Sequence, residues 1–233
     1  MAVVNRIAFI GNSLPRRCGI ATFTTDLQCA VAASRGDLET VIVAMTDHGQ
    51  VYDYPPTVSI EINDNRQDDY VRAAEYLNSG GFEAVSLQHE FGIFGGEAGG
   101  QIMTLLSRLT IPIVTTLHTV LSEPTKVQRE VVARIVEASS KVVVMAEKGR
   151  ELLRSIYQVA DETIETALSG LEIYATCSVH FRGDCGKYTV PSLIHAIPPL
   201  PFRYQVARMI YVVRRSHIGL RYDDSGCTVD YSK

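Results

Sequence analysis

Short apolar runs alternate with helical patterns along residues 6–157 of this 233-residue chain, and no other feature of the sequence constrains its fold as strongly. Six of these runs have the length and composition of buried strands, and they lie at residues 6–10, 40–45, 57–62, 84–90, 111–117 and 141–145. Apolar residues recur at helical spacing after Ile20 and through residues 69–78, 101–109, 124–138 and 147–157. Strands that alternate with helices are typical of a parallel sheet covered on both faces and joined by right-handed crossovers. We therefore expect an α/β fold, a Rossmann-like doubly wound parallel sheet, over residues 1–160.

The alternation ends near Asp161, and the remaining residues follow a different pattern. Residues 163–170 have the pattern of one more strand and a turn, and beyond them only residues 206–213 look regular. The same region holds three of the five cysteines, six of the eleven tyrosines and a proline cluster. We expect residues 161–233 to form an irregular tail that adds no second nucleotide-binding domain.

Composition sets the broad class of the protein. A chain of this length, 46% hydrophobic and 21% charged, can bury a full core without disulfides or metal ions. The net charge is -4 and no run of basic residues occurs, which argues against nucleic acid as the main partner. The five cysteines are odd in number and lack the spacing of metal ligands, so we expect free thiols in a reducing compartment. No apolar run reaches about 18 residues, and the first residues enter a strand directly instead of forming a secretory signal. We therefore expect a cytoplasmic protein without a transmembrane segment.

The segment AVSLQHEFGIFGGEAGG, residues 84–100, joins a buried strand to a helix through a glycine-rich turn. The strand ends in the polar residues His89 and Glu90, and Gly95 and Gly96 precede the expected helix. In open α/β sheets ligands bind at the carboxyl ends of the strands, so these residues are candidates for a functional site. The alternative is that the glycines only let strand and helix pack closely.

A second strand–loop–helix unit begins with the first strand of the chain. Gly11 closes that strand, and a helix begins near Ile20 after a loop that holds Arg16 and Gly19. Such a helix N-terminus offers free N–H groups and the positive end of the helix dipole to an anion. Arg16 and the adjacent Arg17 would add positive charge for a phosphate, and the alternative is two solvated surface arginines. Neither G-x-G-x-x-G nor G-x-x-x-x-G-K-[ST] occurs, which argues against dinucleotide-binding and P-loop functions.

Four segments carry a resemblance to a known family, and they occur in this order: RIAFIGNSLPRRCGIATFTTDL, VSLQHEFGIFGGEAG, PIVTTLHTVL and KVVVMAEKGRELL. The chain resembles the N-terminal half of a family-4 retaining glycosyltransferase of the GT-B fold, in the mannosyltransferase-like group. The resemblance implies that this half mainly holds the acceptor, a glycan or a lipid-linked acceptor. It also implies that a C-terminal domain binds the nucleotide-sugar donor through a basic pair and a paired-glutamate motif. Catalysis would take place in the cleft between the two domains, without a metal ion or another cofactor.

The resemblance also implies roles for individual residues. Gly19 matches the loop whose backbone approaches the donor diphosphate, and Ile20 and Arg16 are the other candidate phosphate contacts, because a leaving diphosphate needs donors aimed at its developing charge. His118 matches the histidine that reaches the transferred sugar and is the candidate catalytic residue, with a purely structural histidine as the alternative. The candidates on the acceptor side, which would hydrogen-bond sugar hydroxyls or line the adjacent loop, are His89, Glu90, Gly95, Gly96 and Glu97. For Glu90 the alternative is a salt bridge or a helix cap.

The chain departs from the family pattern near residue 170. Ser169 stands where family members have a histidine, and no donor domain is recognisable in the residues that follow Gly170. Groups that contact only the donor and the transition state supply most of the rate enhancement of such an enzyme. Three interpretations of the function therefore remain open. The chain could be a half-enzyme for hexosyl transfer, of mannosyl or glucosyl type, that needs a donor domain supplied elsewhere. It could instead be a module that binds a glycan or an anion without turnover, or an inert truncation product whose tail is read in a shifted frame. The sugar, the acceptor and the oligomeric state are not determined by the sequence.

Overall fold

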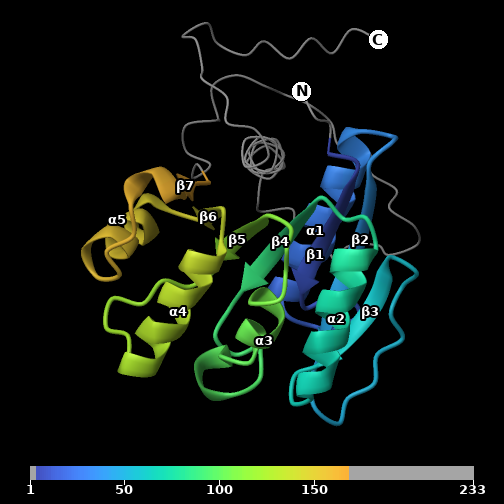
Figure 1. Ribbon diagram of the computed structural model, residues 1–233, viewed down its shortest axis with the longest axis horizontal. Helices are drawn as coiled ribbons and strands as arrows, with labels where there is room; N and C mark the ends of the chain where they lie inside the picture. The colour runs from blue at the N-terminus through green and yellow to red at the C-terminus, as the bar shows by residue number, and fades with distance from the viewer. Residues whose placement is uncertain (1–3, 168–233) are drawn as a thin grey trace, which may run out of the picture.

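The structure is a computed structural model that describes residues 4–167. Seven strands form one sheet in the order β3-β2-β1-β4-β5-β6-β7, and each strand pairs with its neighbours in parallel (Figure 1). The strands are β1 (Arg6–Gly11), β2 (Glu39–Thr46), β3 (Val58–Asn63), β4 (Ala84–His89), β5 (Ile113–Leu117), β6 (Lys141–Val144) and β7 (Ile164–Thr166). The expected Rossmann-like α/β fold with a parallel sheet is thus confirmed.

Five α-helices and two 3-10 helices connect the strands within the described residues. The α-helices are α1 (Gly19–Ser34), α2 (Gln67–Ser79), α3 (Ile102–Leu106), α4 (Lys126–Ala138) and α5 (Glu147–Ser155), and the 3-10 helices are η1 (Glu97–Gly99) and η2 (Asp161–Thr163). Helix α1 covers one face of the sheet, and α2, α3 and α4 contribute to the core on the opposite face. The sheet is therefore covered on both faces, as crossover connections between parallel strands require.

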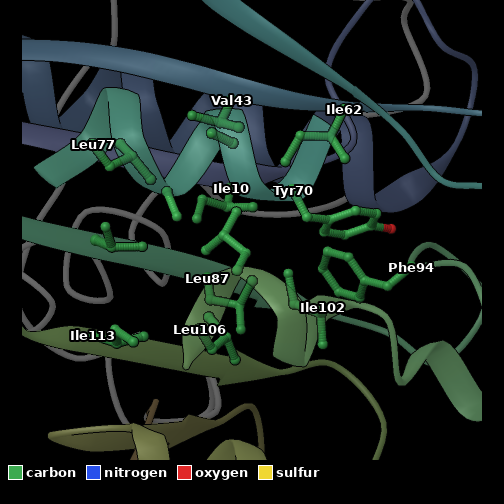
Figure 2. Close-up of a cluster of buried hydrophobic side chains, with 14 of the residues drawn as sticks. Ile10, Val43, Ile62, Tyr70, Leu77, Leu87, Phe94, Ile102, Leu106 and Ile113 are labelled. Atoms are coloured by element: carbon green, nitrogen blue, oxygen red, sulfur yellow. The ribbon is translucent and has the colours of Figure 1, made fainter. Parts of the chain in front are cut away.

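Alternate residues of each strand enter different cores, because successive side chains of a strand point to opposite faces. Ala8 and Ile10 of β1 pack in the core under α2 and α3, whereas Ile7 and Phe9 pack in the core under α1. Figure 2 shows the first of these cores, where side chains from β1, β2, β3, β4 and β5 meet those of α2 and α3. Each large apolar side chain fully buried in this way stabilises the fold by about 1.5–3 kcal/mol. Burial on both faces explains why the strands read as nearly continuous apolar runs.

The helix expected at residues 101–109 is shorter in the structure and is preceded by a separate turn. The 3-10 helix η1 comes first, and α3 spans only Ile102–Leu106. Gly96 and Gly99 have φ of 79° and 75°, and Ala98 between them has φ of 51°. Because a continuous right-handed helix needs negative φ at every residue, these three positions break the helical pattern into two pieces.

The sheet extends beyond residue 160, where the sequence pattern placed the end of the domain. Strand β7 pairs with β6 in parallel, and the backbone N–H of Ala167 donates to the carbonyl oxygen of Val144 at 2.8 Å. Residues 163–170 were expected to add a strand and a turn, and the strand is present. The predictions for Ser169, for the three later cysteines, for residues 206–213 and for the missing donor domain concern residues outside those that the structure describes. Over residues 4–167, none of the helices combines the length and the apolar character needed to cross a bilayer.

Candidate functional site

The carboxyl ends of three adjacent strands meet at one edge of the sheet. Strand β4 lies between β1 and β5, so Gly11 at the end of β1, His89 at the end of β4 and His118 just after β5 come to the same edge. The backbone N–H of His118 donates to the carbonyl oxygen of His89 at 3.1 Å, which continues the β4–β5 pairing past the end of β5. The topology thus brings together the strand ends that the sequence analysis singled out.

The N-terminus of α1 lies at this edge because the loop after β1 leads directly into it. Cys18 is the N-cap residue, and its Sγ accepts a hydrogen bond from the N–H of Ala21 at 3.3 Å. The N–H groups of Gly19 and Ile20, in the first turn, have no intrahelical acceptor, and none is found elsewhere in residues 4–167. A Cβ atom at Gly19 would meet no atom within 4 Å, so the space beside this backbone is open. This geometry suits an anion.

Arg16 lies in the same loop but is held by an acidic residue. Its Nη2 lies 2.8 Å from Oδ1 of Asp47, just after β2, and Asp47 Oδ2 also accepts from the hydroxyl of Tyr52 at 2.9 Å. The Nη1 atom of Arg16 is buried and has no hydrogen-bond partner within the described part of the chain. Arg16 is therefore not a solvated surface arginine. Its charge is partly compensated by Asp47, and one donor remains.

Asn12 is a fully buried polar residue between β1 and α1 that the sequence analysis did not single out. Its Nδ2 donates to Cys18 Sγ at 3.3 Å, so it helps to hold the capping residue of α1 in place. Its Oδ1 is buried without a hydrogen-bond partner in residues 4–167. The only signal in the sequence was its position directly after the glycine that closes the first strand.

His118 stands on the α1 side of this edge and is partly buried. Its ring packs edge-on against the ring of Phe23 in α1, with centroids 4.7 Å apart and planes at 86°. Its Nε2 lies 3.1 Å from Oε1 of Gln88 in β4. Burial lowers the pKa of His118 to about 4, although the negative charge of Glu90 opposes this shift. The ring is therefore neutral near pH 7.

Glu90 joins the ends of β4 and β5. Its Oε1 accepts from the N–H of Phe91 at 3.0 Å, and its Oε2 accepts from the hydroxyl of Thr119 at 2.6 Å. Within the described residues Glu90 forms neither a salt bridge nor a helix cap, the two alternatives raised for it. These two hydrogen bonds link the segments that follow β4 and β5, and the Glu90 side chain remains partly exposed.

His89 lies at the end of β4, directly before Glu90 in the sequence and beside His118 along the sheet edge. Its side chain is fully buried, stacked on Phe94 at 5.9 Å and edge-on to Phe91 at 5.2 Å. Both ring nitrogens lack a hydrogen-bond partner in residues 4–167, and burial lowers the pKa of His89 to about 4. His89 and Glu90, predicted as a pair on the acceptor side, therefore differ in their surroundings, because successive side chains of a strand point to opposite faces. The His89 ring is covered by Phe91 and Phe94, whereas the Glu90 side chain is partly exposed.

The glycine-rich loop is packed tightly against the turn after β3. The N–H of Gly95 donates to the Tyr70 hydroxyl at 3.2 Å, and that hydroxyl donates to the carbonyl oxygen of Asp64 at 3.1 Å. A Cβ atom at Gly95 would lie 1.8 Å from the same Asp64 oxygen. Figure 2 shows Phe94, from this loop, facing Tyr70 in the core. Close packing thus explains why residue 95 is a glycine, and the positive φ of 79° explains why residue 96 is one. The side chain of Glu97 is exposed.

These features define the class of the molecule: a Rossmann-like α/β domain whose polar residues collect at the carboxyl ends of neighbouring parallel strands. Among residues 4–167, no group of three or more His, Cys, Asp and Glu side chains is arranged to hold a metal ion. The residues that could bind a ligand at the edge are backbone N–H groups of α1, the neutral His118 and the carboxylate of Glu90.

No protein-family model matches the chain, and no curated protein matches it. Solved structures similar in fold include a UDP-N-acetylglucosamine 2-epimerase from Rickettsia bellii, with 15% identity and a TM-score of 0.48, covering 73% of this chain and 46% of that one. A glycosyltransferase from Rickettsia africae has 13% identity and a TM-score of 0.48, covering 70% and 42%. The lipopolysaccharide outer core galactosyltransferase WaaB has 10% identity and a TM-score of 0.48, covering 70% and 45%. The chain spans less than half the length of each, and likeness at this level does not assign it to a family.

Proposed function

We propose that this chain is the acceptor-side half of a glycosyltransferase. The complete enzyme would move a hexosyl group, of mannosyl or glucosyl type, from a nucleotide-sugar to a glycan or lipid-linked acceptor. The observation that carries the proposal is the neutral His118 packed on Phe23 of α1, at the strand ends next to the open N-terminus of the same helix. The four segments that resemble family-4 glycosyltransferases support it.

The N-terminus of α1 would receive the diphosphate of the donor. Its free N–H groups at Gly19 and Ile20 point their positive ends toward an anion, and the aligned dipoles of the 16-residue helix add to them. When the sugar leaves, negative charge develops on the diphosphate, and donors already in place stabilise it without reorganisation. Arg16, held by Asp47, would keep the loop in position and contribute its remaining donor Nη1. The resemblance to family-4 glycosyltransferases implies that no metal ion takes part.

His118 would contact the transferred sugar, and Glu90 would face the acceptor. A neutral imidazole hydrogen-bonds a hydroxyl group without adding a charge, which suits an uncharged hexose. Glu90 is partly exposed and accepts hydrogen bonds at the neighbouring strand end. His89 is covered by Phe91 and Phe94, so an acceptor contact through its ring would require this loop to move. Gly95, Gly96 and Glu97 would then act by shaping that loop.

A binding experiment with a matched pair of variants tests the phosphate site. Gly19→Glu places a carboxylate beside the N-terminus of α1, and Gly36→Glu places the same charge just beyond its C-terminus. A Cβ atom has open space at both positions. We expect calorimetric titration with UDP, GDP and their hexose conjugates to show binding to the wild-type chain and to Gly36→Glu, and binding weakened at least tenfold in Gly19→Glu. Equal affinities of the two variants would refute the assignment of α1.

A transfer assay then separates the half-enzyme from a binding module. The purified chain is incubated with each nucleotide-sugar and a panel of acceptors, alone and with an added donor domain of a family-4 glycosyltransferase. The proposal expects no turnover by the chain alone and hydrolysis or transfer when the donor domain is present. Tight glycan binding without nucleotide binding in any combination would favour the non-catalytic module instead.

A further inference from the structure

Gln88 is a buried residue at the sheet edge whose role the sequence analysis did not consider. Its side chain is fully inaccessible to solvent and lies on the α1 side of β4. Its Nε2 donates to Ser86 Oγ at 2.9 Å, and its Oε1 lies 3.1 Å from His118 Nε2. The backbone hydrogen bond from His118 to His89 holds β4 and β5 in the register that makes this contact. The contact is therefore part of the sheet framework.

We propose that Gln88 is a positioning residue that sets the tautomer of His118 and thereby the kind of group this histidine binds. An amide oxygen only accepts hydrogen bonds, so His118 Nε2 carries the proton when it faces Gln88 Oε1. In this orientation the amide N–H₂ of Gln88 also has an acceptor, the hydroxyl oxygen of Ser86. The Nδ1 of His118 is then an acceptor, and it has no partner among residues 4–167.

An acceptor at this position selects a hydroxyl group. Oxygens of an ionised phosphate cannot donate a hydrogen bond, whereas every hydroxyl of a sugar can. His118 Nδ1 would therefore accept from a sugar hydroxyl and leave the phosphates to α1. Because burial lowers the pKa of His118 to about 4, its tautomer and not its charge decides what it binds near pH 7.

Two neighbouring residues keep the pair in place. A Cβ atom at Gly11 would lie 3.0 Å from Gln88 Cβ and 3.0 Å from Thr24 Oγ1, so the glycine leaves the space that Gln88 occupies. The ring of Phe23 supports the imidazole from the α1 side. Elements β1, β4 and α1 thus each hold one part of the arrangement, which is the support that a precisely oriented site requires.

Nitrogen-15 NMR of the full, labelled chain at about pH 7, where the ring of His118 is neutral, tests the tautomer directly. We expect His118 in the wild-type chain to show a protonated Nε2 and an unprotonated Nδ1. Gln88→Leu should give a mixture of both tautomers, while Gln88→Glu should retain the Nε2–H form because a carboxylate also accepts. Gln28→Leu is the matched control: Gln28 is also a buried glutamine bonded to a hydroxyl, that of Thr40 at 2.7 Å, and should leave the His118 signals unchanged.

A protonated Nδ1 in the wild-type chain, or an unchanged tautomer in folded Gln88→Leu, would overturn the proposal. If Gln88→Leu does not fold, the spectra of the wild-type chain and of Gln88→Glu still show whether His118 carries its proton on Nε2. The role in sugar binding rests on the proposed function. We expect Gln88→Leu to lower the affinity for a nucleotide-sugar about tenfold, as for one lost hydrogen bond, and to leave the affinity for the nucleoside diphosphate almost unchanged. If the wild-type chain binds neither ligand, the proposed function fails while the tautomer result stands on its own.

Discussion

Replacing Gly95 with alanine would show whether the loop of residues 91–100 is primarily a packed structural element. The added methyl group would lie 1.8 Å from the carbonyl oxygen of Asp64 and 3.0 Å from Gln101 Oε1. No rotation of a side chain can relieve the first contact, because the oxygen belongs to the backbone, so the loop has to move. Overpacking of this kind costs about 1–3 kcal/mol. Losing the hydrogen bond from Gly95 to Tyr70 adds about 1 kcal/mol.

We therefore expect Gly95→Ala to lower the free energy of unfolding by about 2–4 kcal/mol, which corresponds to a fall in Tm of roughly 5–15 °C for a domain of this size. Urea denaturation followed by circular dichroism measures the first quantity, and calorimetry measures the second. Gly92→Ala is the control, since a Cβ atom there meets nothing within 4 Å, and its effect should stay within about 1 kcal/mol. Equal stability of the two variants would refute the packed loop and would leave ligand contact as the reason for the glycine.

Three further outcomes are expected. His118→Ala should weaken binding of a nucleotide-sugar about tenfold and lower Tm by only a few degrees, because the ring is partly exposed; a large fall in Tm with unchanged binding would mark the histidine as structural. Burial lowers the pKa of His89 and His118 to about 4 from their ordinary 6.5, so the unfolded chain takes up protons first as the pH falls. Stability should be complete above about pH 6.5 and fall toward pH 4 by about 1.4 kcal/mol per pH unit for each histidine. Urea denaturation across this range should show the loss, His89→Phe should remove about half of it, and a flat profile in the wild-type chain would contradict the burial. Finally, α4 should not hold the protein on anionic vesicles, since Lys126 pairs with Glu130 at 3.8 Å and Arg129 donates to a backbone carbonyl at 2.6 Å; cosedimentation at physiological salt would overturn this.

The sequence by itself determined which segments form most of the strands of the parallel sheet. Its apolar runs predicted six parallel strands, and each lies within two residues of its observed bounds at either end. The physical reason is that a strand buried on both faces has to be apolar almost throughout, which leaves a clear signal in the chain. The same pattern placed Gly11, Glu90 and His118 at strand ends, and parallel pairing then brings those ends to one edge. The start of α1 followed equally from local features, because a loop that ends in a glycine precedes an apolar repeat.

Only the tertiary structure decided what each polar side chain does at that edge. His89 and Glu90 are adjacent in sequence, yet the His89 ring is buried against Phe94, whereas the Glu90 carboxylate accepts a hydrogen bond from Thr119. Arg16 meets Asp47 from another strand end, a pairing that no local pattern records. Nothing in the sequence distinguishes Gln88 from other strand residues until β5 places His118 beside it. Close packing was one of two interpretations of Gly95, and its partner, Asp64, is known only from the structure. Apart from the contact of His89 with Phe94, these contacts join residues that are 29 or more positions apart, so they depend on how the elements assemble. Periodicity reports only which face of one element is apolar.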